Sequence, residues 1–300
     1  MNLSINEILL ICAALLPAIV LCVYIYKKDG VEKEPIHLLL CLLALGCAIC
    51  YPAAELETII GKLLTKIFTP YGRMIGGKLY LADGPYKIYH ACKYFIGVAL
   101  VEEGLKFLAL HFATRKNKNF NSLFDGVIYA VFVSLGFAAL ENVLYVLRYG
   151  WMNAFVRGVL SVPGHMFFGV IMGYYYSLSH MHEKAREQEQ ILKRAGYISY
   201  SGKEFSGKMY LFLSLLIPTV AHGIYDFCCT SNSTLATISF YGFIFFLYIY
   251  CFTKISNVSR FDMRDSMCAN ALMQKKYPHL KDVLVQDLLK NEEDTDSPLM

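Results

Sequence analysis

The stretch VALVEEGLKFLAL, Val98 to Leu110, places two adjacent carboxylates and a lysine inside an apolar run of membrane-spanning character. A charged side chain near the middle of a bilayer costs roughly 2.5 to 3.5 kcal/mol on insertion scales, so such groups face partners or water rather than lipid. On a helix, Lys106 follows Glu102 by four residues and Glu103 by three, which puts the ammonium within reach of both. The spacing predicts that Lys106 pairs with one carboxylate and leaves the other for chemistry.

The composition around this stretch is that of a membrane protein. The chain has 300 residues, of which 56% are hydrophobic, and its mean hydropathy is +0.42. Several apolar runs approach the 20 residues that span hydrocarbon as a helix. The formal charge of +4 comes from connecting loops, and nothing indicates a nucleic-acid partner. The composition therefore predicts an all-α polytopic helical membrane protein in the lipid bilayer.

Seven transmembrane helices are predicted, and a polar catalytic core is expected from the third to the sixth. The spans are Ile8–Tyr26, Ile36–Ala54, His90–Ala113, Asn121–Val146, Gly158–Leu178, Met209–Cys228 and Leu235–Phe252. The organisation that follows has three parts: two spans and an outside loop in residues 1–90, a core in 91–253, and a cytoplasmic tail in 254–300.

The connecting segments carry further expectations. The glycine- and proline-containing segment Glu55–Tyr89 is predicted to be an outside loop, in which Glu57–Phe68 is compatible with an interfacial helix. The charged segment after the fifth span is predicted to form a short separate cytoplasmic helix that ends at Gly196. The acidic finish of the tail, Asn291–Met300, is predicted to be disordered.

Charge also predicts the orientation. With the N-terminus outside, about 19 of the 28 Lys and Arg residues fall in inside segments. Because cytoplasmic loops carry an excess of these residues, the expected topology has the N-terminus outside and the C-terminus in the cytoplasm.

Polar residues on separate spans are expected at one depth. At about 1.5 Å per residue, Glu103, His165 and His222 lie roughly 18 to 21 Å from the basic ends of their spans. Asp226 follows His222 by four residues, so both lie on one helix face and the carboxylate can orient the imidazole. A carboxylate and two imidazoles shielded from bulk solvent are what water activation needs.

Simpler roles exist for several of these groups. A single intramembrane histidine is often a packing residue, and Glu102 with Lys106 could be a buried structural pair. Glu141 and Asn142 could tie helices together, and Asp125 could be a helix-end residue near the interface. Lys106, Asp125, Glu141 and Asn142 are therefore candidates for supporting positions. Gly169 and Gly173, four residues apart, permit the close helix approach that a packed polar core needs.

Five blocks in order resemble the PrsW family of intramembrane proteases, which is distantly similar to the CAAX prenyl endopeptidases. They are EEGLK (Glu102–Lys106), FDGVIYA (Phe124–Ala130), GFAALEN (Gly136–Asn142), PGHMFFGVIMG (Pro163–Gly173) and HGIYDF (His222–Phe227). The resemblance is specific because each block centres on polar residues within a span.

The resemblance implies a bacterial membrane endopeptidase that acts on single-span membrane proteins. The typical substrate is an anti-sigma factor cut on its outer side, so that a second protease follows in a stress response. Glu102 and Glu103 match the family's paired glutamates, and His165 matches its histidine. His222 with Asp226 resembles the His-x-x-x-Asn/Asp block of the wider group.

Two mechanisms fit these residues. In the first, Glu103 or Glu102 is the general base, His165 holds the same water, and His222 with Asp226 stabilises the oxyanion. In the second, His165, His222 and Glu103 bind zinc and leave a position open for water, although no HExxH motif is present. The sequence leaves both open.

Two other classes of function also fit part of the pattern. A proton-coupled carrier or channel would line a cavity with Glu, His and Asp near the midplane. Against it stands the absence of a detectable internal repeat. A silent membrane scaffold would not require so many ionisable groups at one depth.

Overall fold

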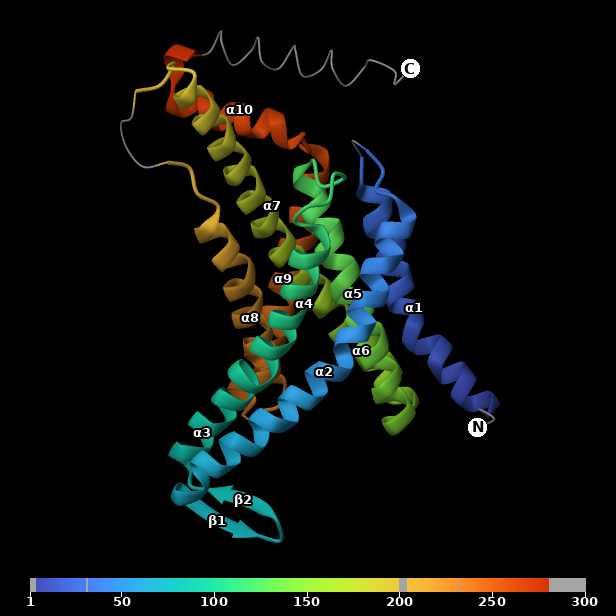
Figure 1. The fold of residues 1–300 in the computed structure, drawn as a ribbon. Coiled ribbons are helices and arrows are strands. Elements are labelled where there is room, and N and C mark those ends of the chain that lie inside the picture. Colours follow the sequence, from blue (N-terminus) through green and yellow to red (C-terminus); the bar gives the residue numbers. More distant parts are fainter. Residues whose placement is uncertain (1–3, 31, 200–203, 232, 281–300) are drawn as a thin grey trace.

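The structure is a computed structural model that describes residues 4–30, 32–199, 204–231 and 233–280 (Figure 1). The helices are α1 (Ile5–Lys28), α2 (Ile36–Phe68), α3 (Asp83–Cys92), α4 (Leu100–Thr114), α5 (Leu123–Tyr149), α6 (Trp151–Val159), α7 (Ser161–Arg194), α8 (Lys208–Cys229), α9 (Thr234–Arg260) and α10 (Asp265–Lys276). A π-helical segment, Lys93–Ala99, joins α3 to α4, and short 3₁₀ turns lie at Thr69–Tyr71 and Pro278–Leu280. Strands β1 (Gly72–Ile75) and β2 (Lys78–Leu81) form an antiparallel hairpin.

Six helical stretches among the described residues are long and apolar enough to cross a membrane. They are Ile5–Lys28, Ile36–Tyr71, Leu123–Tyr149, Trp151–Arg194, Lys208–Cys229 and Thr234–Arg260, and they correspond to six of the seven predicted spans. The remaining predicted span, His90–Ala113, is shared by α3, the π-helical segment and α4. The all-α polytopic class is confirmed. The seventh predicted span is not among the six long apolar helices because α4 is only 15 residues long and carries three charged groups.

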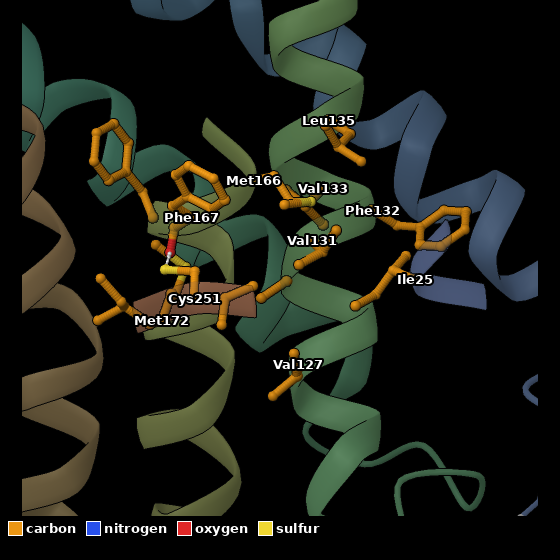
Figure 2. Packing of buried hydrophobic residues seen from close by; sticks show 14 of the residues in the cluster. Ile25, Val127, Val131, Phe132, Val133, Leu135, Met166, Phe167, Met172 and Cys251 are labelled. Atoms are coloured by element: carbon orange, nitrogen blue, oxygen red, sulfur yellow. Dashed lines mark hydrogen bonds between the residues drawn. The ribbon is translucent and has the colours of Figure 1, made fainter. Parts of the chain in front are cut away.

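Helix α5 lies at the centre of the bundle, with α1 and α2 on one side and α7 on the other (Figure 1). Of its most apolar 18-residue window, 89% is buried. In Figure 2, Phe132 of α5 points toward Ile25 of α1, and Met166 of α7 lies beside Val133. This apolar layer packs α5 against α7. Both helices also supply residues to the polar site.

Glycines let α5 and α7 approach closely. A Cβ atom added at Gly173 would lie 2.2 Å from the carbonyl oxygen of Gly126, and one at Gly169 would lie 2.8 Å from Oγ of Ser134. Both separations are shorter than van der Waals contact, so a side chain at either position would push the helices apart. The close approach predicted from Gly169 and Gly173 is therefore observed.

Helix α2 is longer than predicted. It continues from the second span through Phe68, so the predicted outside loop does not begin at Glu55, and Glu57–Phe68 is not a separate interfacial helix. Pro52 is tolerated within α2, and helix-breaking residues come only at Pro70 and in the glycine-containing hairpin. The connecting segment is accordingly short and consists of the hairpin and α3.

Helix α7 also extends past its predicted end. The fifth span and the charged segment after Leu178 form one helix that ends at Arg194, instead of a span and a separate helix. Gly196 follows with a φ of +79°, a left-handed conformation that favours glycine after a helix end. The helix therefore ends next to Gly196, as the sequence predicted. It is, however, one continuous helix with the fifth span.

The chain after the seventh predicted span is helical for much of its described length. Helix α9 continues to Arg260, and α10 packs against α7. Leu192 of α7 forms a small buried cluster with Met273 and Tyr277. The predicted disorder of Asn291–Met300 lies outside the described residues. In Figure 1, α10 lies at the end of the bundle opposite the β1–β2 hairpin.

Candidate active site on α4, α5, α7 and α8

A π-helical segment directly precedes the helix that carries the paired glutamates. In Lys93–Ala99 the helix widens, and the N–H of Leu100 bonds to the carbonyl of Phe95, five residues earlier. Such insertions are rare and often lie at functional sites. Glu102 and Glu103 follow in the first turn of α4.

Lys106 is the centre of the polar cluster. Its Nζ lies 3.0 Å from Oε2 of Glu102 and 2.8 Å from Oε1 of Glu103, on the same helix, and 3.0 Å from Nδ1 of His165 on α7. The side chain is fully buried, and its ammonium lies 4.2 Å from the ring centroid of Phe137. The predicted pairing is therefore present, but the lysine contacts both carboxylates instead of one.

The hydrogen bonds of His165 define which ring nitrogen carries a proton. An ammonium group has donors only, so Nδ1 of His165 accepts from Lys106. The other nitrogen, Nε2, lies 3.1 Å from Oε2 of Glu141 and donates to that carboxylate. We assign the neutral Nε2–H tautomer on this geometry. Its Nδ1 lone pair points to the ammonium of Lys106 on α4.

His222 joins the cluster from α8. Its Nδ1 lies 3.0 Å from Oε1 of Glu103, and its Nε2 lies 3.5 Å from Oδ2 of Asp226. The imidazole stacks on Phe168 at 4.8 Å between ring centroids and lies 5.4 Å from the ring of His165. The structure thus brings together the three groups that the sequence placed at one depth, with Asp226 beside them.

One carboxylate oxygen in the cluster has no partner. Oε2 of Glu103 is buried and forms no hydrogen bond with any described residue, although Oε1 of the same group has two. A buried polar atom without a partner costs about 1–3 kcal/mol. The oxygen is therefore a natural place for a water molecule or a cation to bind.

The residues present fit a metal ion by donor type. Donor atoms of Glu102, Glu103 and His165 all lie within 4.8 Å of one another. This set differs from the predicted His165, His222 and Glu103, because His222 is turned to Glu103 as a hydrogen-bond partner. Lys106 contacts all three donor groups, so a metal and its ammonium would compete for the same position.

The structure reveals a supporting residue that the sequence reasoning missed. Nη2 of Arg157, on the amphipathic helix α6, lies 2.7 Å from Oε2 of Glu141, and its Nε lies 3.2 Å from Oδ1 of Asn142. The Nδ2 group of Asn142 in turn donates to the carbonyl of Ala14 in α1 at 2.9 Å. Glu141 and Asn142 therefore link the helices and also reach the site through His165. A lone arginine in the apolar run WMNAFVRGVL was the available signal.

Asp125 does not join the cluster. It lies in the first turn of α5, where it accepts hydrogen bonds from the backbone N–H groups of Asn121 and Ser122 at 2.8 and 2.7 Å. It lies 16 residues, or about 24 Å along the helix, from Glu141. Its role is the capping box of α5, which confirms the helix-end alternative from the sequence and not a supporting position at the site.

Glu57 is a second residue that the prediction placed elsewhere. Because α2 continues past the predicted loop boundary, its half-buried carboxylate lies close enough to interact electrostatically with Glu102, His222 and Asp226. Its sequence context, an apparent loop, gave no signal for this. Glu57 therefore adds a further carboxylate near the cluster.

Known proteins resemble this chain over most of its length. The family described as "PrsW family intramembrane metalloprotease" matches residues 34–253, which include α2 and the hairpin as well as the five blocks. Protease PrsW of Bacillus subtilis is 32% identical over 75% of this chain and 84% of its own length. Protease PrsW of Shouchella clausii is 29% identical over 84% and 98%, and that of Clostridioides difficile is 30% identical over 71% and 76%. No solved structure matches.

These matches extend over most of the chain and most of each relative, and they favour a protease over a carrier, channel or scaffold. The matched relatives are bacterial, and the matched region contains Glu102, Glu103 and Lys106 of this chain. The chain belongs to the PrsW family of intramembrane metalloproteases.

Proposed function

We propose that this intramembrane endopeptidase cleaves its substrate at the cluster of Glu102, Glu103, Lys106, His165 and His222. The observation that carries the proposal is the buried Lys106 ammonium within 3.0 Å of two carboxylates and an imidazole, beside a carboxylate oxygen without a described partner. Peptide hydrolysis needs a base for water and a donor for the oxyanion, and this cluster holds both.

Glu103 is the better candidate for the general base. Its Oε1 is fixed by Lys106 and His222, which leaves Oε2 to accept a hydrogen bond from the attacking water. A carboxylate held in this way is pre-oriented, so no rotation is needed when the water gives up its proton. Glu102 anchors the lysine through a single 3.0 Å contact.

His165 is suited to hold the same water. Glu141 fixes its ring through Nε2, and Nδ1 accepts a hydrogen bond from Lys106, so Nδ1 becomes free to hold the water only when the ammonium gives up this contact. A carboxylate that orients an imidazole in this way also raises its basicity. The water would then be held between Glu103 and His165.

The oxyanion role predicted for His222 is reassigned in this proposal. Both ring nitrogens of His222 face carboxylates, those of Glu103 and Asp226, so neither N–H points to free space. His222 is better suited to orient Glu103. Lys106 supplies positive charge for the developing oxyanion, and a hydrogen bond to it would replace one of the three that the ammonium makes with Glu102, Glu103 and His165.

A metal ion would be held by Glu102, Glu103 and His165. When bound, zinc supplies Lewis-acid activation of water or of the peptide carbonyl. Three protein ligands with one open position are the usual arrangement of a catalytic zinc site. Lys106 would then turn from the donors, and Glu141 would remain the outer partner that orients His165.

The proposed substrate is a single-span membrane protein such as an anti-sigma factor. The family resemblance implies this class, and the relatives named above come from bacteria. We place the N-terminus outside and the C-terminus in the cytoplasm, on the basic bias of the loops. Cleavage on the outer side would leave a membrane-bound fragment for a second protease.

Co-expression with a tagged library of single-span proteins tests the function. The wild-type chain should release the outer domain of at least one library member. Glu102→Gln, Glu103→Gln and His165→Ala should each lower cleavage at least about 100-fold, the lower limit of a general-base contribution. His90→Ala, which alters a buried histidine of α3 outside the cluster, is the control and should cleave normally. Normal cleavage by Glu103→Gln would exclude this site.

A further inference from the structure

A polar cavity lies between α4, α7 and α8, apart from the candidate active site. Its volume is about 290 Å³, enough for roughly ten water molecules at about 30 Å³ each. Arg115, at the end of α4, lines it, and this residue is about 18 Å along the helix axis from Glu103. The cavity therefore lies near the end of the bundle that carries the basic segment TRKNKN, residues 114–119.

Three helices each contribute a cation to this cavity. Arg115 follows α4, Lys184 belongs to α7, and Lys208 is the first residue of α8. Arg115 and Lys208 are exposed at the cavity, and neither forms an ion pair with a described residue. Lys184 lies 3.8 Å from Glu187.

The two acidic side chains that line the cavity already have partners. Glu183 accepts a hydrogen bond from the backbone N–H of Gly207 at 2.9 Å and pairs with Arg186 at 2.6 Å. Glu187 pairs with Lys184. The charges of Arg115 and Lys208 are thus not compensated by these acids, and the cavity carries an excess of positive charge.

Neutral groups in the wall also favour an anion. Nδ1 of His111 is buried and has no hydrogen-bond partner among the described residues, so a bound ligand could satisfy it. The 22-residue helix α8 begins at Lys208 and directs the positive end of its dipole to the same region. Both features add to the two uncompensated cations.

The surroundings indicate where the anion comes from. Leu108 and Phe112 on α4, and Met209 and Phe212 on α8, are apolar side chains with 46%, 68%, 64% and 58% of their surface exposed. Exposed apolar side chains on membrane helices face lipid tails. A molecule with a phosphate in the cavity and acyl chains along α4 and α8 would satisfy both surfaces.

We propose that this cavity binds the phosphate group of an anionic phospholipid. Basic pockets between transmembrane helices at the membrane surface bind lipid headgroups in this way. Arg115 and Lys208 bind the phosphate oxygens, and His111 adds a hydrogen bond from the wall. The site is independent of the active site, so its test does not depend on proteolysis.

Native mass spectrometry of the full chain, purified from a defined mixture of phosphatidylglycerol and phosphatidylcholine, tests the proposal. The wild-type protein should retain phosphatidylglycerol selectively. The double variant Arg115→Gln/Lys208→Gln should retain less, by about fivefold for each charge removed. Lys116→Gln/Lys118→Gln is the matched control, since it removes two exposed charges from the same segment outside the cavity. The control should retain the lipid as the wild-type protein does.

A second arm distinguishes a lipid from a free anion. Millimolar inorganic phosphate is added to the lipid-loaded protein. Displacement of the lipid in the wild-type protein identifies free phosphate as a second ligand of the same site, and the absence of displacement identifies the lipid as its ligand. Equal lipid retention by the two double variants, when both melt at the wild-type temperature, would overturn the proposal.

Discussion

Nδ1 of His165 accepts a hydrogen bond from Nζ of Lys106 across 3.0 Å, which joins α7 to α4 in the buried centre of the protein. Because the lysine can only donate, the proton of a neutral His165 must lie on Nε2, where Glu141 accepts it at 3.1 Å. The protonation pattern of the site thus depends on a carboxylate of α5 that touches neither Glu102 nor Glu103.

The first prediction concerns Glu141. Glu141→Ala removes the acceptor that fixes the ring of His165, so turnover should fall about 10- to 100-fold, as for other residues that orient a ligand histidine. Glu141→Gln keeps a carbonyl oxygen that can accept from Nε2 and should restore part of the activity. Purified protein in proteoliposomes with a fixed substrate gives both values. Wild-type turnover by the alanine variant would show that His165 needs no orienting partner.

The second prediction compares two lysines. Lys106→Met leaves two buried carboxylates without their counter-charge, and breaking a buried pair in this way costs about 3–5 kcal/mol. Lys93→Met alters an exposed lysine that lies 5.1 Å from the ring of Tyr94 and should change stability by less than about 0.5 kcal/mol. Thermal melting in detergent measures the difference. Equal melting temperatures for the two variants would show that Lys106 does not neutralise Glu102 and Glu103.

The residues of the polar core were predictable because charge is rare in a membrane span. Glu102, Glu103, His165 and His222 each interrupt an apolar run, and helix rise alone placed Glu103, His165 and His222 at one depth. Their contacts follow that prediction. The hydrogen-bond partners of these groups were not predictable. Lys106 and His165 are 59 residues apart in sequence, and their contact depends on how α4 and α7 pack.

The errors have a common physical origin. Asp125 and Glu141 are acidic residues of the same predicted span, and both were kept as candidates for supporting positions. Asp125 lies at the start of α5 and caps it, whereas Glu141 lies toward the other end and contacts His165. Glu57 lay in an apparent loop because the amphipathic part of α2 loses the continuous apolar run of a span. A helix that continues without a breaker has no sequence signal at the membrane boundary.

The third prediction concerns the metal. One equivalent of zinc should be retained on purification, a chelator should remove activity, and added zinc should restore it. Glu103→Gln/His165→Ala should lose the metal, whereas His222→Ala should keep most of it, because His222 lies outside the donor set within 4.8 Å. Elemental analysis of each variant measures the content. Full activity with far less than one metal per chain would leave Glu103 and His165 to activate the water alone.

The fourth prediction concerns topology and uses exposed positions at opposite ends of the bundle. In a background without the native cysteines, Lys118→Cys and Arg194→Cys should resist an impermeant thiol reagent added to whole cells, because both lie in basic segments. Lys78→Cys, in the β1–β2 hairpin, should react. Permeabilised cells are the control, in which all three should react. The reverse pattern would place the hairpin in the cytoplasm.

The last prediction concerns a carboxylate between α1 and α2. Glu34 is buried, accepts a hydrogen bond from Tyr129 at 2.6 Å, and lies near Asp125 and Asp29. Burial is the main reason that the pKa of Glu34 rises to about 8, and the neighbouring acids add to the shift. The folded protein therefore binds this proton more tightly than the unfolded chain does.

The sign of the pH effect follows from that difference. Below about pH 4.5 the carboxyl is protonated in both states and contributes no pH dependence. As the pH rises from there to about 8, unfolding releases a proton, so the stability of the folded protein falls across this window and then levels off. Burial of Asp262 near the same place raises its pKa to about 6 and gives a similar, earlier loss.

Glu34→Gln keeps a neutral side chain at all pH values, so it should flatten this dependence. Its melting temperature at pH 8 should exceed that of the wild-type protein by a few degrees, given about 2–4 °C per kcal/mol for a chain of this size. At pH 4 the two proteins should melt within about one degree of each other, because Glu34 is then mostly protonated in both the folded and the unfolded state. Glu32→Gln, which alters an exposed neighbour, is the control and should follow the wild-type curve. A Glu34→Gln protein that loses as much stability as the wild type between pH 5 and pH 8 would show that Glu34 is already ionised in the folded state and that Tyr129 is bonded to a carboxylate.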